Sequence, residues 1–213
     1  MLTVHHLGIS QSERIVWLCE ELEIAYRLIR YERDPVTRLA PPDYKALHPF
    51  GTAPVITDGD LVLGESGAII EYIIARYGGG HLAVKPDSPD FPHYLYWFHF
   101  ANGSLMPAGM AELIINVLGV PAEGPIVETL RARGNRAFEM IEKRLGTADY
   151  FAGKAFSAAD IIMLFPLTTM RAFVPRDLSP YPNIRAYLKR IGERPAYQRA
   201  MKKGDPGFTP LLA

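Results

Sequence analysis

The fold of this chain is decided by residues 51–70, which read GTAPVITDGDLVLGESGAII. Asp58-Gly59 separates two short β-prone runs, and Asp and Gly tolerate the positive φ that a two-residue hairpin turn requires. Apolar residues at helical spacing follow the hairpin, namely Ile69, Ile70, Ile73 and Ile74. We therefore expect two antiparallel strands and then a helix that begins at Glu65 and Ser66.

The expected helix start offers polar groups of a distinct kind. Backbone N–H groups at a helix start lack partners within the helix and attract anions. Glu65 adds a carboxylate there, and Ser66 adds a hydroxyl. This combination suits a ligand with an ammonium and a carboxylate on one carbon, as in the head group of an amino acid. The alternative is that both side chains only cap the helix.

The rest of residues 1–79 completes a mixed sheet. Leu2–His6 and Ile24–Tyr31 are β-prone runs, and Arg14–Leu22 between them has apolar residues at helical spacing. A right-handed crossover makes these two strands parallel, so the hairpin extends the sheet to four strands. The order βαβ and then ββα predicts an α/β domain of thioredoxin-like plan. A long connection that contains several prolines, Arg33–Phe50, joins its halves.

The composition changes after residue 79. Glycine and proline mark a linker at residues 80–90, and β-prone runs nearly vanish after it. Helical patterns then occupy Phe91–Leu118, Val127–Leu145, Ser157–Met170, Ile184–Ile191 and Ala196–Lys202. We therefore expect an all-helical second domain at residues 91–213. The sequence SAAD at residues 157–160 is a capping box, which specifies where one of these helices begins.

Composition and charge exclude several classes of protein. The 213 residues carry 23 Lys and Arg against 23 Asp and Glu, so no nucleic-acid partner is expected. Cys19 is the only cysteine, which excludes an internal disulfide framework and a cysteine-based zinc cluster. The histidine spacing does not favour a metal site on one helix. With no signal segment and no bilayer-spanning apolar run, we expect a soluble cytoplasmic protein without a membrane partner.

Three motifs in this arrangement resemble those of the cytosolic glutathione S-transferase family. They are SQSER at residues 10–14, GTAPVI at residues 51–56 and ES at residues 65–66. The linker and the capping box of the second domain also match, so the resemblance spans nearly the whole chain. Other segments of the chain, together with the serine at position 10, are similar to those of a bacterial and fungal branch of this family. The resemblance implies a glutathione-binding first domain and a helical domain with a pocket for the second substrate.

The residue before the first helix carries the chemistry in that family, and here it is Ser10. Its hydroxyl would donate a hydrogen bond to the glutathione sulfur, so it stabilises a thiolate and does not itself attack. A free thiol has a pKa near 8.5, and only the thiolate is the nucleophile. The hydrogen bond and the helix end together lower that pKa by roughly one to three. The alternative is that Ser10 or Ser12 only caps the helix.

The resemblance also implies which residues hold the tripeptide. Pro54 matches a proline that is cis in the family, and a cis bond turns the backbone of Ala53 outward to pair with an extended peptide. Glu65 and Ser66 match the residues that hold the γ-glutamyl ammonium and carboxylate. Thr52 stands where many relatives have Lys or Gln, so one contact departs from the pattern. The residue that holds the glycine carboxylate stays open.

A pocket for the second substrate is expected where the first long helix of the second domain faces the thiol. Candidates for its wall are Tyr94, Trp97, Phe98, Met106 and Met110. Aromatic and Met side chains at helical spacing are also typical of an ordinary core, so core packing is the alternative.

The sequence therefore predicts a cytoplasmic glutathione transferase that activates glutathione for attack on small hydrophobic electrophiles, in detoxification. A homodimer is implied by the resemblance alone. One alternative is a protein of the same fold that binds glutathione without conjugation, and another is a glutathione-dependent peroxidase or dehalogenase. The sequence GESGA at residues 64–68 resembles a serine-hydrolase elbow, but no histidine follows His99, which excludes that chemistry. The electrophile and the class within the family stay open.

Overall fold

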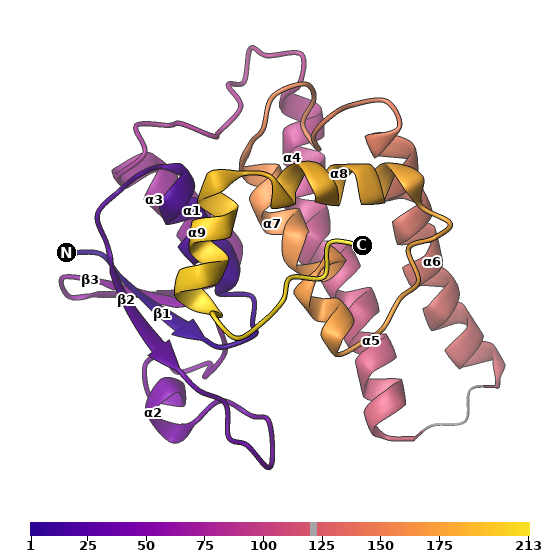
Figure 1. The fold of residues 1–213 in the computed structure, drawn as a ribbon, viewed down its shortest axis with the longest axis horizontal. Coiled ribbons are helices and arrows are strands. Elements are labelled where there is room, and N and C mark those ends of the chain that lie inside the picture. Colours follow the sequence, from indigo (N-terminus) through magenta and orange to yellow (C-terminus); the bar gives the residue numbers. More distant parts are fainter. Residues whose placement is uncertain (120–122) are drawn as a thin grey trace. The chain divides into compact units, whose positions relative to one another are not determined.

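The computed structural model of the chain describes residues 1–119 and 123–213, which pack into two compact units (Figure 1). The first unit contains Met1–Ala83 together with Gly192–Pro210. The second unit contains Val84–Ile191 and Leu211–Ala213. Among the described residues, no helix combines the length and the apolar character needed to cross a bilayer.

The first unit is built on a mixed sheet of four strands in the order β2-β1-β3-β4. The strands are β1 (Thr3–Leu7), β2 (Arg27–Tyr31), β3 (Val55–Asp58) and β4 (Leu61–Gly64). β1 and β2 are parallel because α1 (Glu13–Glu21) crosses between them, whereas β3 is antiparallel to both β1 and β4. The thioredoxin-like plan that the sequence predicted is confirmed.

The hairpin lies one residue later than the sequence pattern indicated. Asp58 pairs with Leu61, so the two-residue loop begins at Gly59. Gly59 takes a left-handed φ of 59°, which costs glycine little because it has no Cβ. Asp58 therefore stays in β3, where its carboxylate accepts a hydrogen bond from Tyr72 at 2.8 Å.

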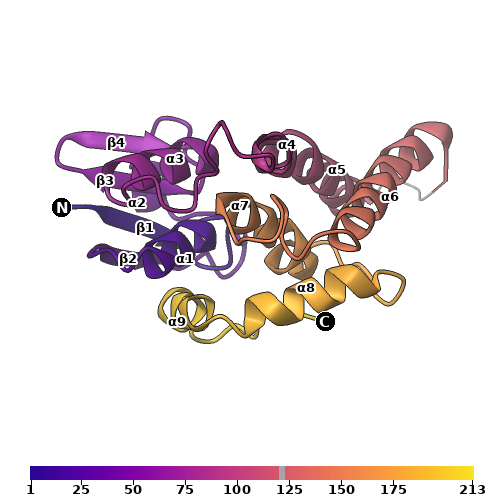
Figure 2. The same ribbon diagram turned by 90° about the horizontal axis from the view of Figure 1, so that it is seen from above.

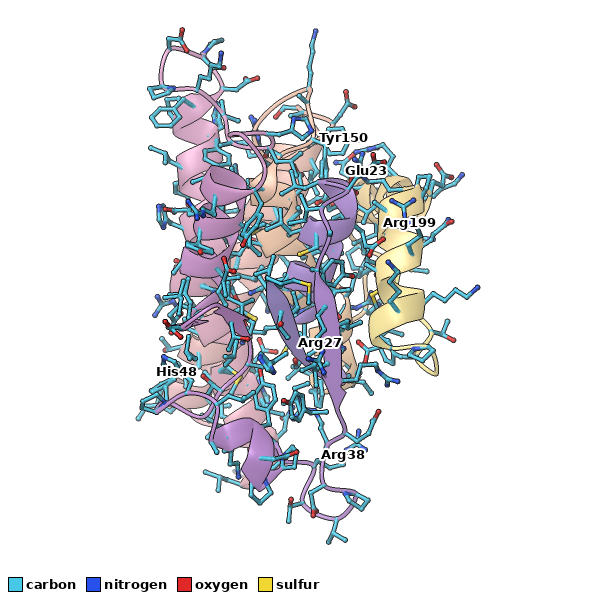
Figure 3. All side chains as sticks on the ribbon, turned by 90° about the vertical axis from the view of Figure 1, so that its left-hand side faces the viewer. Glu23, Arg27, Arg38, His48, Tyr150 and Arg199 are labelled. Atoms are coloured by element: carbon cyan, nitrogen blue, oxygen red, sulfur yellow. The ribbon has the colours of Figure 1, made fainter. Side chains whose placement is uncertain are left out.

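The helices of the first unit come from both ends of the chain. Besides α1 they include α2 (Pro42–Lys45), α3 (Ser66–Arg76) and α9 (Pro195–Gly204). α9 lies beside α1 in both ribbon views (Figure 1, Figure 2). Tyr197 of α9 packs edge-on against Trp17 of α1, with ring centroids 5.3 Å apart. Figure 3 shows Arg199 on α9 near Glu23, which follows α1.

This packing differs from the expected division of the chain. The sequence assigned residues 91–213 to one helical domain, but Gly192–Pro210 packs with the sheet unit. The physical reason is that the apolar face of α9 covers α1, with Ala196, Tyr197, Ala200 and Met201 buried. The linker at residues 80–90 and the limit at residue 79 stay predictions.

The regular structure of the second unit is helical over its described residues. Its helices are α4 (Phe91–Phe100), α5 (Met106–Val117), α6 (Pro125–Leu145), α7 (Ala158–Leu167) and α8 (Pro182–Gly192). α6 lies beside α5 (Figure 2). A 3-10 turn, Thr169–Ala172, follows α7. The prediction of an all-helical second part is confirmed.

The long helix expected over residues 91–118 is interrupted. A π-helical turn, Ala101–Leu105, separates α4 from α5. Pro107 lies in the first turn of α5, has no N–H to donate, and in a regular helix its ring would clash with the carbonyl four residues earlier. A wider turn before the proline relieves that clash, which accounts for the π-helical segment.

Candidate functional site

Ser10 lies in the turn between β1 and α1, and 4% of it is exposed. Its Oγ accepts a hydrogen bond from the N–H of Ser12 at 3.2 Å and lies 2.8 Å from Ser12 Oγ. Ser12 occupies the N-cap position of α1, but its side chain makes no capping hydrogen bond. The hydroxyl of Ser12 is therefore not a helix cap and is directed toward other partners.

The backbone immediately before Ser10 is held in an unusual conformation. Ile9 has a φ of 52°, which a β-branched residue rarely adopts. The Ile9 N–H donates to Asp205 Oδ1 at 2.9 Å, and Arg33 donates to the carbonyl oxygens of Ile9 and Gly8 at 3.1 and 2.9 Å. These contacts fix the turn and with it the position of the Ser10 hydroxyl.

A fully buried histidine connects this turn to the segment after α9. His6 Nδ1 lies 2.9 Å from Ser12 Oγ, and His6 Nε2 lies 3.0 Å from Asp205 Oδ2. Burial raises the pKa of Asp205, but hydrogen bonds from His6 and Ile9 outweigh it and hold this pKa below its ordinary value. Asp205 is therefore a carboxylate at neutral pH.

The register of the sheet brings the three sequence motifs to one edge. Val55, the first residue of β3, pairs with His5 near the end of β1 and with Gly64 at the end of β4. The turn after β1, the segment before β3 and the start of α3 after β4 therefore adjoin the same edge of the sheet. Arg14 of the first motif and Ser66 at the start of α3, which are 52 positions apart in the chain, are thus joined by a hydrogen bond.

The segment before β3 has the backbone that the resemblance implied. The peptide bond between Ala53 and Pro54 is cis. Pro54 is buried, Ala53 is half-buried and Thr52 is exposed. Ala53 packs against a cluster of buried apolar side chains that contains Leu7, Tyr44 and Val55.

The start of α3 places a buried hydroxyl beside an exposed carboxylate. Ser66 is 1% exposed, and its Oγ accepts a hydrogen bond from Arg14 at 3.3 Å. Glu65 is exposed, has a φ of 68° and makes no side-chain capping hydrogen bond. Helix capping therefore does not account for the Glu65 carboxylate.

Arg14 has a role that its place in the first motif did not suggest. It is fully buried and also donates to Gln11 Oε1 at 2.9 Å. Burial lowers the pKa of Arg14 to about 9, against the opposing charge of Glu13, so it is cationic at neutral pH. The sequence does contain a signal for this role, because Arg14 directly precedes the apolar residues of α1. An arginine that is buried there needs a partner, since arginine is almost never fully buried without one.

The candidates for the second-substrate pocket fall into two groups. Tyr94, Trp97, Phe98 and Met106 are buried, whereas Met110 is 41% exposed. Trp97 packs against Phe100 and Phe151 with centroids 5.1 and 5.2 Å apart, as the core alternative expects. A role of these residues in binding a substrate stays a prediction.

A small cavity lies inside the second unit next to Met106. Its volume is about 30 Å³, and Phe138 and Met170 also line it. That volume holds one or two water molecules and not an organic electrophile. Within the described residues, no group of three or more His, Cys, Asp or Glu side chains is arranged to hold a metal ion.

Two family models match the chain. One describes the N-terminal domain of glutathione S-transferase and matches residues 10–76, and the other describes its C-terminal domain and matches residues 105–195. The chain belongs to the glutathione S-transferase family. The first matched segment contains Ser10, the Ala53-Pro54 bond and the start of α3.

Individual members of the family resemble the chain over most of its length. Glutathione S-transferase 3 of Schizosaccharomyces pombe is 32% identical over all of this chain and 92% of the relative. The crystal structure of a glutathione S-transferase from Actinobacillus pleuropneumoniae has a TM-score of 0.88 at 33% identity, over 98% of this chain and 97% of the other. A theta class enzyme from Xanthomonas axonopodis pv. citri with glutathione bound has a TM-score of 0.70 at 26% identity, covering 93% and 96%.

Proposed function

We propose that this glutathione transferase binds glutathione along the sheet edge where β1 and β4 end and β3 begins. The observation that carries the proposal is the register of the sheet, in which Val55 pairs with both His5 and Gly64. This register supports the proposal because the turn that holds Ser10, the cis bond before β3 and the start of α3 all adjoin the same edge of the sheet. Each of these three places offers a different group to a tripeptide.

The γ-glutamyl head group is assigned to the start of α3. The exposed carboxylate of Glu65 suits the ammonium, and the hydroxyl of Ser66 with the N–H groups of the helix start suits the carboxylate. The buried cation of Arg14, hydrogen-bonded to Ser66, adds positive charge on the carboxylate side. The backbone of Ala53, which directly precedes the cis bond to Pro54, pairs with the peptide, and Thr52 lies next to it.

The sulfur is assigned to Ser10. A hydrogen bond from a neutral hydroxyl to a thiolate contributes about 1.5–3 kcal/mol, and it is stronger where water is excluded. Ser10 is buried, so its hydroxyl meets this condition. The thiolate then attacks the electrophilic carbon, its lone pair forming the carbon–sulfur bond as the leaving group departs with its electron pair.

Family membership supports the remaining features of the proposal. We infer a cytoplasmic homodimer that conjugates small hydrophobic electrophiles in detoxification. Tyr94, Trp97, Met106 and Met110 are the residues assigned to the wall of the electrophile pocket.

The test is a titration of the protein with glutathione while the ultraviolet absorbance of the thiolate is recorded, followed by an assay with an aromatic halide. We expect Ser10→Ala to raise the pKa of the bound thiol by about one to two and to lower kcat about 10- to 100-fold. Ser179→Ala, an exposed serine of the second unit, is the matched control and should change neither quantity. An unchanged pKa and rate in Ser10→Ala, or wild-type binding without conjugation of any electrophile, would overturn the proposal.

A further inference from the structure

Four side chains form a continuous buried chain of hydrogen bonds that ends at Ser10. Asp205 Oδ2 lies 3.0 Å from His6 Nε2, His6 Nδ1 lies 2.9 Å from Ser12 Oγ, and Ser12 Oγ lies 2.8 Å from Ser10 Oγ. Their exposed fractions are 5% for Asp205, 0% for His6 and Ser12, and 4% for Ser10. Solvent therefore does not interrupt the path between the carboxylate and the proposed thiol-binding hydroxyl.

The partners of each atom determine where the protons lie when His6 is neutral. A carboxylate only accepts, so His6 Nε2 carries the proton and donates it to Asp205, which leaves Nδ1 as an acceptor. Ser12 Oγ lies 2.9 Å from His6 Nδ1 and 3.3 Å from the carbonyl oxygen of Leu7, and the shorter contact directs its O–H to His6 Nδ1. Ser12 Oγ also accepts the N–H of Leu7 at 3.1 Å, so its second lone pair accepts the O–H of Ser10.

In this state the hydroxyl of Ser10 points inward and cannot donate to a ligand. Ser10 Oγ accepts the N–H of Ser12, and one lone pair remains for a proton from outside. A thiol, which still carries a proton, is therefore a suitable partner for this orientation. A thiolate, which has none, requires the hydroxyl to turn outward.

We propose that this chain is a proton relay through which His6 takes the proton of the bound glutathione thiol. The proposal rests on the proposed binding of the sulfur at Ser10. The thiol proton moves to Ser10 Oγ as the Ser10 proton moves to Ser12 Oγ and the Ser12 proton moves to His6 Nδ1. Each oxygen gains one proton and loses one, the S–H electron pair stays on sulfur, and the net charge is unchanged.

The relay ends with two stabilised charges. The hydroxyl of Ser10 now points outward and donates to the thiolate, while the new imidazolium of His6 is paired with the carboxylate of Asp205. A serine hydroxyl alone is too weak a base to keep the proton, and His6 supplies the base at a distance. His6, Ser12 and Asp205 thus act through Ser10 as positioning residues.

Other groups around the buried pair define its electrostatic surroundings. The charges of Arg30 and Arg33 act on Asp205 from β2 and the connection after it, and Tyr197 of α9 interacts electrostatically with Asp205 and with Glu13. Gly204 at the end of α9 packs against the imidazole, where an added Cβ would lie 3.3 Å from His6 Nε2. The ring therefore has a tight fit between α9 and the turn.

The variant Asp205→Asn stops proton transfer to His6 but keeps the hydrogen bonds that hold His6 and Ile9 in place. An asparagine can accept the N–H of Ile9 with Oδ1 and donate with Nδ2 to His6 Nε2, so both hydrogen bonds persist. His6 Nδ1 then carries the proton and cannot accept another. We expect the pKa of the bound thiol to rise by about one or more, whereas the affinity for S-methylglutathione, which has no thiol proton, stays within about 2-fold.

Two further variants complete the experiment. Ser12→Ala cuts the same path and should raise the pKa of the bound thiol, and combining it with Asp205→Asn should add little, because both remove one function. Asp58→Asn is the matched control, since that carboxylate also accepts two side-chain hydrogen bonds in the first unit, from Tyr72 and Tyr77. It should leave the thiol pKa unchanged.

The outcomes separate the two proposals. If wild type does not bind S-methylglutathione, the proposed site itself is wrong. If wild type binds it and forms the thiolate, but neither Asp205→Asn nor Ser12→Ala shifts the thiol pKa, the relay is overturned. A loss of S-methylglutathione affinity as large as the pKa effect would also overturn it, because the residues would then only support the fold.

Discussion

At the scale of single residues, the site combines side chains that the sequence identifies with partners that it does not. Ser10 was predicted because it precedes a helix in a recognisable motif. Its relay partner Asp205 comes 195 positions later, and no periodicity relates the two. The sequence indicated only that the histidine spacing does not favour a metal site, and the hydrogen bonds of His6 to Ser12 and Asp205 depend on the fold.

The first residue-scale prediction concerns the head group of the ligand. Ser66→Ala removes a buried hydroxyl and leaves Arg14 without one of its acceptors. We expect the Kd for glutathione to rise about 10- to 100-fold, since a hydrogen bond to a charged group contributes about 1.5–3 kcal/mol. The value of kcat at saturating glutathione should stay within about 2-fold, because Ser66 holds the end of the ligand far from the sulfur.

Steady-state kinetics with glutathione varied at fixed electrophile distinguish these effects. Ser88→Ala, a half-exposed serine of the second unit, is the control for the loss of a hydroxyl. A variant Ser66→Ala with normal affinity but reduced kcat would contradict the assignment of the head group to α3.

At the scale of elements, α7 shows how a local signal acquires long-range partners. The capping box at residues 157–160 was predicted, and it forms: Asp160 Oδ2 accepts the N–H of Ser157 at 2.9 Å. Asp160 Oδ1 also accepts the N–H of Phe151 at 2.9 Å and the hydroxyl of Tyr187 at 3.2 Å. These two contacts connect α7 to the preceding loop and to α8, which no short motif could indicate.

Asp160→Asn is the prediction that belongs to this element. Burial raises the pKa of Asp160 to about 6, although every hydrogen bond to it favours the charged form, so it is a carboxylate at neutral pH. All hydrogen-bond partners of the two Asp160 oxygens are donors. In the asparagine variant the amide nitrogen replaces one oxygen, so it faces one or two of these donors and cannot accept a hydrogen bond from them. We expect the free energy of unfolding to fall by about 2–4 kcal/mol near neutral pH.

Urea unfolding followed by circular dichroism measures this loss. Asp149→Asn makes the same chemical change at an exposed position of the same unit and should stay within about 0.5 kcal/mol of wild type. Equal stability of the two variants would show that the buried network around α7 contributes little.

At the scale of the whole molecule, the sequence predicted the order of the parts better than their packing. Strands, helices and turns depend on residues close together in the chain, so periodicity and turn chemistry located them. α9 was predicted as a helix, but an amphipathic pattern shows only that one face is apolar and not which element it covers. The return of Gly192–Pro210 to the sheet unit was therefore missed.

The last prediction concerns the electrostatic attachment of this returning segment. Glu20 of α1 accepts hydrogen bonds from Arg199 at 3.1 Å and from Lys203 of α9, and from Tyr26 at 2.7 Å. Figure 3 shows Arg199 on α9, with Glu23 close to it after the end of α1. Burial raises the pKa of Glu20, but these three hydrogen bonds outweigh it and hold the pKa below its ordinary value.

The sign of the pH dependence follows from that lowered pKa. Because the unfolded state binds the proton more tightly than the folded state, the contribution of Glu20 is fully present above its unfolded pKa of about 4.3. It is lost as the pH falls through the lower folded pKa. Glu20→Gln should therefore cost about 1–2 kcal/mol near neutral pH, a value reduced for the partial exposure of Arg199 and Lys203.

Urea unfolding of wild type and Glu20→Gln over a series from about pH 7 to about pH 3 measures this difference. The gap between the two proteins should close at the acidic end, since the protonated glutamate and the glutamine then make similar bonds. Glu23→Gln removes the same charge from an exposed residue just beyond α1, and it should stay close to wild type throughout. A gap that persists unchanged into acid would mean that Glu20 holds α9 by packing and not by its charge.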